Sequence, residues 1–257
     1  MRLYIAPATG PLRSGEDRDL PPGPSRHAQV RRVQPGDTLQ LFDGQGCDWP
    51  AEVLAVGRSA VRVRVGLPLP VAAELPMAVT IALGMPANER MDAVVEKATE
   101  LGVAAIQPLH TERSVLRLTG DRAEKKRAHW QAIAEAACEQ CGRARVPLVL
   151  PVRPITEWLA AQRQAALSAE PSADGTLRLL LSLQPDAQDL PARARHAAGR
   201  VLTLNGPEGG LTPDEEQAAR HAGFRPTDLG PRVLRADTAP LAVLAALAWL
   251  GPHRNTG

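Results

Sequence analysis

Two apolar runs in the second half of the chain constrain the fold more than any other feature. Leu177 to Leu183 and Val201 to Leu204 consist mainly of aliphatic residues and lack the strict alternation of a half-exposed strand. Strands of this kind lie in parallel sheets whose two faces are both covered. Because helices must supply that cover, the sequence predicts an α/β domain.

The segment before these runs contains the expected helices. Strand-like runs at Ala78 to Leu83 and Ala104 to Leu109 alternate with helical patterns at Glu89 to Leu101 and about Arg122 to Gly142. Both helices have an apolar stripe at helical spacing. The stripes are Met91, Val94, Val95, Ala98 and Leu101 in the first helix, and Trp130, Ile133, Ala134, Ala137, Cys138 and Cys141 in the second.

Capping patterns predict where helices begin and end. Asp121 with Glu124 resembles a capping box, and Thr212-Pro213-Asp214-Glu215 combines such a box with a proline in the first turn. Gly223 is expected to end that helix. The last predicted helix, Pro240 to Leu250, is apolar nearly all round, so we expect it to be buried, with a second subunit as its cover.

The first 70 residues have a different pattern, of short strand-like runs separated by turns such as Pro35-Gly36-Asp37 and Asp43-Gly44. Leu12 to Ser25 is rich in Pro, Gly, Arg and Asp and is interpreted as an exposed loop. A small β-barrel is the fold that this pattern favours. The predicted strands are Arg2 to Ala6, His27 to Val33, Thr38 to Phe42, Trp49 to Val56 and Ala60 to Val65.

Three prolines between Gly66 and Pro76 indicate a semi-rigid linker. We therefore predict two domains, residues 1–72 and residues 73–257.

Composition narrows the cellular setting. No apolar run approaches the roughly 20 residues that span a bilayer, and Met1 to Leu20 carries charges where a secretory signal would be apolar. Three cysteines suit a reducing compartment, so a cytoplasmic protein with no membrane contact is expected. The six histidines, at positions 27, 110, 129, 196, 221 and 253, lack metal-ligand spacing, and no metal site is predicted.

Cys138-Glu139-Gln140-Cys141 could indicate redox or metal chemistry. Both sulfurs fall on the apolar stripe of a predicted helix, so a structural role is favoured.

The strongest candidate for a ligand site is the segment Gly206-Pro207-Glu208-Gly209-Gly210. It follows a buried strand and precedes a capped helix, which is where open α/β sheets bind ligands. Its glycines allow close backbone approach, although a plain glycine-rich turn remains an alternative. Glu208, with no lysine nearby, argues against a phosphate loop. A second constellation, Leu229 to Ala239, places Gly230, two arginines and an acid before the last helix.

Several motifs in order resemble the RsmE-type 16S ribosomal RNA uridine-N3 methyltransferases of the SPOUT class. These motifs are His27 to Val33, Gly36-Asp37, Phe42-Asp43-Gly44, Lys97 to Val103, Glu112-Arg113-Ser114, Glu139 to Arg143, Gly206 to Gly210 and Leu229 to Ala239.

The resemblance implies an N-terminal PUA-like RNA-binding barrel, a C-terminal SPOUT-type α/β domain with a deep trefoil knot, a homodimer, and 16S rRNA in the 30S subunit as substrate. It also implies S-adenosyl-L-methionine as cofactor, bent in the knot with its adenine held by backbone groups. The implied cofactor residues are Leu183, Gln184, Leu204, Asn205, Gly206, Pro207, Glu208, Gly209, Gly210, Leu229, Gly230, Val233 and Leu234. The family usually has Arg-x-Glu-Thr where this chain has Arg235-Ala236-Asp237-Thr238, which puts any role of a longer carboxylate in doubt.

Catalysis by such an enzyme requires alignment of the methyl group with uridine N3 and removal of the N3 proton. No histidine is evidently placed as a base. Arginine could stabilise charge on the base carbonyls. The catalytic candidates are Arg143, Arg232 and Arg235 as cations, and Glu139 and Asp237 as proton acceptors.

Arginine dominates the 30 basic residues, since only Lys97, Lys125 and Lys126 are lysine, and its planar fork suits RNA. A GC-rich genome or a heat-adapted host would also explain this preference, and the net charge is only +2. A solvated surface is the alternative for each candidate. The RNA-binding candidates are Arg26, Arg31, Arg32, Arg62, Arg64, Arg113, Lys125 and Lys126, with Arg117, Arg122 and Arg127 nearby.

Three other functions remain open: a ribose 2′-O-methyltransferase of the same class acting on transfer RNA, a non-catalytic RNA-binding protein, and a nucleotide-dependent α/β enzyme. The missing loop lysine weighs against the last.

Overall fold

The computed structural model describes residues 1–168, 175–194 and 199–250, and these residues form two compact units. The first contains Met1–Glu74 together with Glu135–Val146, and the second contains Leu75–Ala134 and the remainder of the chain from Pro147. The sequence did not predict that the segment 135–146 belongs with the N-terminal residues. No helix among the described residues is long and apolar enough to cross a membrane.

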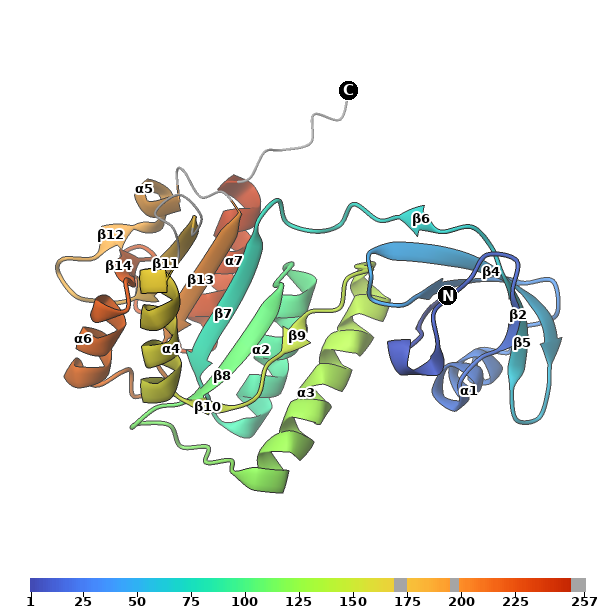
Figure 1. The fold of residues 1–257 in the computed structure, drawn as a ribbon, viewed down its shortest axis with the longest axis horizontal. Coiled ribbons are helices and arrows are strands. Elements are labelled where there is room, and N and C mark those ends of the chain that lie inside the picture. The colour runs from blue at the N-terminus through green and yellow to red at the C-terminus, as the bar shows by residue number, and fades with distance from the viewer. Residues whose placement is uncertain (169–174, 195–198, 251–257) are drawn as a thin grey trace. The chain divides into compact units, whose positions relative to one another are not determined.

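The second unit is a parallel sheet that is covered on both faces (Figure 1). The strand order is β10-β8-β7-β13-β11-β14-β12, with β9 beside β8, and every pairing is parallel. The elements are β7 (Ala78–Gly84), α2 (Asn88–Glu100), β8 (Ala105–His110), α3 (Gly120–Cys141, whose last turns belong to the first unit), β9 (Leu148–Val149), β10 (Arg153–Pro154), α4 (Ile155–Ser168), β11 (Thr176–Leu181), β12 (Gln188–Asp189), α5 (Leu190–Ala194), β13 (Arg200–Asn205), α6 (Pro213–His221), β14 (Arg225–Asp228) and α7 (Thr238–Leu250).

Alternate residues of the central strands face two different cores. Ile81 and Val201 pack with α2, α3, α5 and α7, whereas Ala82 and Leu202 pack with α4 and α6. This arrangement confirms the predicted α/β class, because apolar runs buried on both faces need helices on both sides.

Two helix predictions need adjustment. The helix α3 begins at Gly120, so Asp121 lies in its first turn instead of preceding it. One face of α7 is covered by its own chain, because Val243, Leu244 and Leu247 are fully buried in the core that α2 and β7 share, whereas Trp249 near its end is 75% exposed. Cover of this other face by a second subunit stays a prediction. By contrast, α6 has the predicted capping box, in which Thr212 and Glu215 exchange hydrogen bonds.

The first unit has a six-stranded sheet of order β1-β3-β4-β5-β2, with β6 beside β4. Only β1 and β3 pair in parallel. Alternation on β5 buries its three valines and exposes its two arginines, as predicted. The elements are β1 (Arg2–Tyr4), β2 (Asp17–Asp19), α1 (Pro22–Val30), β3 (Thr38–Phe42), β4 (Cys47–Val56), β5 (Val61–Val65) and β6 (Leu69–Pro70).

Two predictions for this unit were wrong. Most of the run His27 to Val33 belongs to the helix α1 or to the turn after it, and is no strand. The helix begins at Pro22, and prolines are tolerated in a first turn because its amide groups have no intrahelical partner. The segment Leu12 to Ser25 is no simple exposed loop, since Leu12, Leu20 and Ser25 are buried and the segment includes β2.

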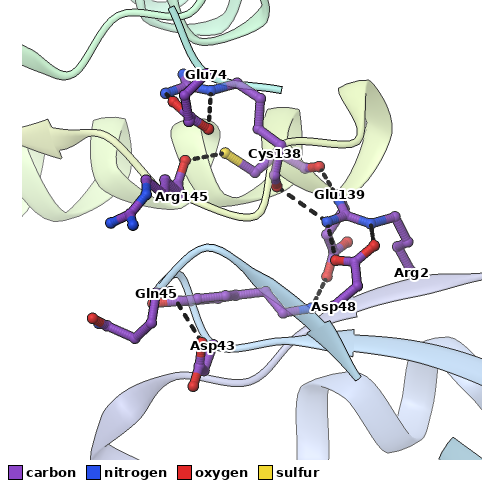
Figure 2. Close-up of polar contacts among 10 residues, drawn as sticks. Arg2, Asp43, Gln45, Asp48, Glu74, Cys138, Glu139 and Arg145 are labelled. Carbon is purple, nitrogen blue, oxygen red and sulfur yellow. Dashed lines mark hydrogen bonds and ion pairs between the residues drawn. The ribbon is translucent and has the colours of Figure 1, made fainter. Parts of the chain in front are cut away.

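The end of α3 is bound into the first unit by charged side chains (Figure 2). The Arg2 guanidinium donates to the Cys138 carbonyl at 2.6 Å and to the Asp48 carboxylate at 2.6 Å, and it lies 4.3 Å from the centre of the Phe42 ring. The Glu139 carboxylate accepts from the Tyr4 amide at 2.8 Å. The Cys138 carbonyl also accepts from the Gly142 amide at 3.2 Å, so Arg2 provides a second donor to a carbonyl in the last turn of α3.

Candidate functional site

Three loops meet at the carboxyl edge of the parallel sheet in the second unit. They follow β11, β13 and β14, which are neighbouring strands, so their ends lie together. The loops enclose a cavity of about 660 Å³, which is within the range of roughly 300–1,000 Å³ typical of small-molecule sites. Its lining consists of Arg90, Leu181, Ser182, Leu183, Asn205, Gly206, Pro207, Glu208, Gly209, Gly210, Thr227, Asp228, Leu229, Arg232, Val233, Leu234, Arg235, Ala236 and Ala239.

The loop after β13 is folded tightly on itself, and this geometry requires glycine. A Cβ atom on Gly206 would lie 2.5 Å from the carbonyl carbon of Gly210 and 2.6 Å from the amide nitrogen of Leu211. Gly210 has a φ of +70°, and its amide donates to the Pro207 carbonyl at 2.8 Å. The glycines are thus explained by backbone proximity and conformation.

Gly84, at the end of β7, is a part of this arrangement that the sequence analysis missed. A Cβ there would lie 2.5 Å from Cδ of Pro207, so the loop can rest on β7 only because residue 84 has no side chain. A glycine inside a strand pattern often marks such a close approach, and this signal was available in the sequence.

Arg113 supports the same loop from outside. Its Nη1 donates to the carbonyl of Gly209 at 2.8 Å and to that of Leu211 at 3.3 Å. The guanidinium that the sequence assigned to RNA is therefore engaged with the glycine loop.

Glu208 faces Arg90 at the rim of the cavity. The Arg90 Nη1 donates to Oε1 of Glu208 at 3.1 Å, and the Ala87 amide approaches the same oxygen at 3.4 Å. The carboxylate thus links the glycine loop to the start of α2. The sequence analysis assigned Glu208 a role only among the cofactor residues that the resemblance implies, and it did not single out Arg90.

Asn205 joins two of the three loops. Its Nδ2 donates to the carbonyls of Gly206 and Ala236, each at 3.0 Å. The side chain is buried, and its Oδ1 has no hydrogen-bond partner within the described part of the chain. An unmet buried acceptor beside a cavity is a group that a ligand could satisfy.

Most of the predicted cofactor residues line this one cavity, together with the catalytic candidates Arg232 and Arg235. Six predicted cofactor or catalytic residues do not line it, and four of them lie in the second unit. Leu204 is fully buried in the core, the Gln184 amide donates to Ser182 Oγ at 3.2 Å, the Gly230 amide donates to Asp228 at 2.8 Å, and Asp237 is half-buried beside Thr238. The lining residues that the sequence analysis missed are Arg90, Leu181, Ser182, Thr227 and Asp228, whereas Ala236 and Ala239 lie within the predicted segment Leu229 to Ala239.

The other two catalytic candidates lie in the first unit. The Arg143 side chain is only 4% exposed and forms an ion pair with Glu74, with its Nε 3.2 Å from Oε1. Glu139 accepts from the Tyr4 amide, and its second oxygen lies 3.9 Å from Nδ1 of His27. Both side chains therefore have contacts within the first unit that explain them without catalysis.

The remaining RNA-binding candidates differ in their freedom. Arg64 is paired with Asp17 at 2.7 Å, and Lys126 lies 3.7 Å from Asp92 and over the Trp130 ring. These two cations are partly neutralised by acids. Arg26, Arg32, Arg62 and Lys125 are exposed. Each of the other four is exposed or half-buried, namely Arg31, Arg117, Arg122 and Arg127.

Cys138 has a structural environment. It is fully buried against Phe42 and Ala144, and its Sγ donates to the Arg145 carbonyl at 3.5 Å (Figure 2). A hydrogen bond with Cys141 and burial both raise the pKa of the Cys138 thiol above its ordinary value, so the protonated form is favoured. No group of three metal-ligating side chains occurs in the described ranges, and His196 and His253 lie outside them.

Comparison with known proteins identifies the family. Residues 73–248 match the model of an RNA methyltransferase domain, and residues 25–66 match that of an RNA methyltransferase PUA domain. The two matches define the class as an RNA methyltransferase that carries a PUA domain.

Curated relatives narrow this class. The ribosomal RNA small subunit methyltransferase E of Mycobacterium tuberculosis is 34% identical over 87% of this chain and 82% of its own length, and that of Bacillus subtilis is 31% identical over 86% and 84%. The chain belongs to the ribosomal RNA small subunit methyltransferase E family.

Solved structures agree with this assignment. The Neisseria gonorrhoeae methyltransferase E bound to S-adenosyl methionine is 38% identical, covers 97% of both chains and superposes with a TM-score of 0.84. A putative methyltransferase from Legionella pneumophila, in complex with the same cofactor, is 31% identical with a TM-score of 0.84 and the same coverage.

Proposed function

We propose that this protein transfers a methyl group from S-adenosyl-L-methionine to N3 of a specific uridine in 16S rRNA of the 30S subunit. The observation that carries the proposal is the cavity around Gly206–Gly210, at the carboxyl edge of the parallel sheet. Family membership and the cofactor bound in two similar structures support it.

The cavity fits this cofactor in size and chemistry. Leu181, Leu229 and Leu234 provide apolar contact for an adenine ring, and loop backbone is available for its polar edge. The open Oδ1 of Asn205 offers an acceptor. An added Cβ atom on Gly210 would meet nothing within 4 Å, so the backbone there faces open space.

The cofactor supplies an electrophilic methyl group, and the protein must orient it and manage charge on the uracil. Arg232 and Arg235 are exposed at the cavity and form no ion pair with any other described residue. In the proposed reaction they stabilise negative charge on the uracil carbonyls as the N3 proton leaves. Asp237, which is close in sequence, is the proposed proton acceptor, and its shorter side chain would be bridged by water.

The chain path after β14 supports the proposed trefoil knot. Residues 229–237 leave β14, return to Asn205 at the end of β13, and lead into α7, which packs on α2 and β7. In the same proposal, the sheet of the first unit is the PUA-like barrel, the active form is a homodimer, and the protein acts in the cytoplasm.

The test is incubation of purified 30S subunits with methyl-labelled cofactor, followed by nucleoside analysis. We expect label in N3-methyluridine at one position of 16S rRNA. Label in a 2′-O-methylated nucleoside would indicate the ribose-directed alternative. Absence of label despite calorimetric binding of the cofactor would refute the proposed reaction, and absence of cofactor binding would favour a non-catalytic RNA-binding protein.

A further inference from the structure

A second cavity of about 540 Å³ lies in the same unit and has no role in the reaction as proposed. It is found at the carboxyl ends of β8 and β10, next to the first turns of α4 and α6, two helices that lie side by side in Figure 1. The lining residues come from three segments, with His110, Glu112 and Arg117 from the first, Ile155 and Leu159 from α4, and Asp214 from α6.

One wall of this cavity is apolar. Ile155 and Leu159 are almost fully buried but still border the cavity, and Pro154 and Ala218 extend the same wall. An apolar wall with polar groups at its edge suits a flat aromatic ligand, which can lie against the wall and form hydrogen bonds with its rim.

The rim presents hydrogen-bond acceptors. Among the described residues, the exposed carboxylates of Glu112 and Asp214 take part in no hydrogen bond or ion pair. The His110 Nε2 lies 2.6 Å from the Leu118 carbonyl and 3.4 Å from the Leu118 amide, and the shorter contact favours a proton on Nε2, because a carbonyl oxygen only accepts. In the neutral ring Nδ1 is then left as an acceptor. That Nδ1 is buried and has no partner in the described ranges.

The charges disfavour an anion. Among the described lining residues Arg117 is the one arginine or lysine, and it donates to the Glu112 carbonyl at 2.8 Å, while three carboxylates border the same cavity. The carboxylate of Glu215 is already occupied by the Thr212 and Glu112 amides. An RNA phosphate would be repelled here, whereas a ligand with N–H donors would be bound.

The cavity is directly coupled to the proposed cofactor loop. The Glu112 amide donates to Glu215 at 2.8 Å, and the next residue, Arg113, donates to Gly209 in the glycine loop. Adjacent residues thus connect this cavity, which Glu112 lines, to the glycine loop that lines the first cavity and that Arg113 contacts.

We propose that this second cavity binds a nucleobase with an exocyclic amine, from a nucleotide that flanks the methylated uridine. Guanine fits best, because its N1–H and 2-amino groups together match one carboxylate. Adenine and cytosine offer the amine alone, and uracil has none. The inference deepens the proposed function and rests on it for the source of the base.

The first test measures binding of guanosine, adenosine, cytidine and uridine by saturation-transfer NMR, with the protein saturated in S-adenosyl-L-methionine so that the first cavity is occupied. We expect guanosine to bind most tightly and uridine at least 10-fold more weakly. Glu112→Gln and Asp214→Asn should each weaken guanosine binding roughly 10-fold, as expected for loss of a charge-assisted hydrogen bond. Glu157→Gln is the matched control, because Glu157 lies in the first turn of α4 outside the lining.

Equal binding of the four nucleosides, or guanosine binding unchanged in both variants, would overturn the proposal. An unchanged melting temperature shows that each variant is folded. Since this test needs no methyl transfer, it can succeed even if the proposed reaction fails.

The second test uses methylation of 30S subunits. Glu112→Gln should raise KM for the subunit about 10-fold, while kcat and cofactor affinity stay as in the unmodified protein. If the cavity instead held a phosphate, removing a negative charge would lower KM, and that result would exclude a base site. If the wild-type protein did not methylate 30S subunits, that result would count against the proposed function but not against the base site.

Discussion

Two groups of arginines in this protein have opposite environments. Arg2 and Arg143, in the first unit, are largely buried and paired with Asp48 and Glu74. Arg232 and Arg235, in the second unit, are exposed at a cavity and have no acidic partner among the described residues. A buried arginine needs a partner because desolvation of its charge is costly, whereas an exposed one can keep its donors available.

Burial and ion pairing decide whether an arginine in a sequence motif has a structural or a catalytic role. Both Arg143 and Arg235 are catalytic candidates when judged by motif alone. Burial and pairing explain Arg143 as part of the structure that holds the end of α3, and leave Arg235 as a cation without a structural task. The following substitutions test this distinction, in order of decreasing expected effect.

Arg143→Ala should mainly reduce stability. It leaves the Glu74 carboxylate without its partner and opens space in a buried region, and breaking a buried ion pair typically costs about 3 to 5 kcal/mol. Thermal unfolding followed by circular dichroism should show a clearly lower melting temperature. Turnover per folded molecule, measured well below that temperature, should be preserved. Lost turnover with an unchanged melting temperature would show that Arg143 acts in catalysis, and the two groups of arginines would then not differ in role.

Arg235→Gln should reduce turnover and leave stability unchanged. Loss of one preorganised donor at a site of developing charge usually lowers kcat by roughly 10²- to 10³-fold. We expect that loss in 30S methylation, with the melting temperature and cofactor affinity unchanged. Arg225→Gln is the control, since Arg225 is an exposed arginine at the other end of β14 and outside the cavity. Equal activity of the two variants would show that Arg235 has no catalytic role.

Gly206→Ala tests the backbone instead of a charge. The new Cβ would collide with the backbone of Gly210 and Leu211, so the loop would have to open, at a strain of roughly 1 to 3 kcal/mol. Calorimetry should show about 10- to 100-fold weaker binding of S-adenosyl-L-methionine. Gly209→Ala is a milder control, because the nearest atom to its Cβ would be the Arg113 Cβ at 3.2 Å, and a small shift would relieve this contact. A larger effect from Gly209→Ala would contradict the packing argument.

The sequence predicted the α/β class because buried parallel strands leave a direct record in apolar runs, and β11 and β13 are those runs. The sequence did not predict α1, because the prolines in its first turn are also typical of loops and its apolar face is too short to indicate a helix. Local patterns also could not show that residues 135–146 belong with the N-terminal unit, since Arg2 and Cys138 meet only through tertiary structure.

The sequence predicted the site residues that form a continuous motif in one loop. It missed the residues whose role depends on contacts with distant parts of the chain. Gly206 to Gly210 is visible as a motif. Arg90 and Gly84 are not, because their importance comes from contact with Glu208 and Pro207, more than 100 positions later in the sequence.

Glu208→Gln tests an ion pair of intermediate exposure. The pair of Glu208 and Arg90 is half-exposed at the rim of the cavity, so it is less buried than the pair of Arg143 and less exposed than Arg232 and Arg235. Ion pairs of this kind are usually worth about 0.2 to 1 kcal/mol, so cofactor affinity should fall no more than about 5-fold, and the loss should shrink as salt is added. Arg90→Gln should have the same effect, and the double variant should be no worse than either single one, because both remove one interaction. A far larger loss of turnover in Glu208→Gln than in Arg90→Gln would mean that the carboxylate acts on the substrate and that its pairing with Arg90 is incidental.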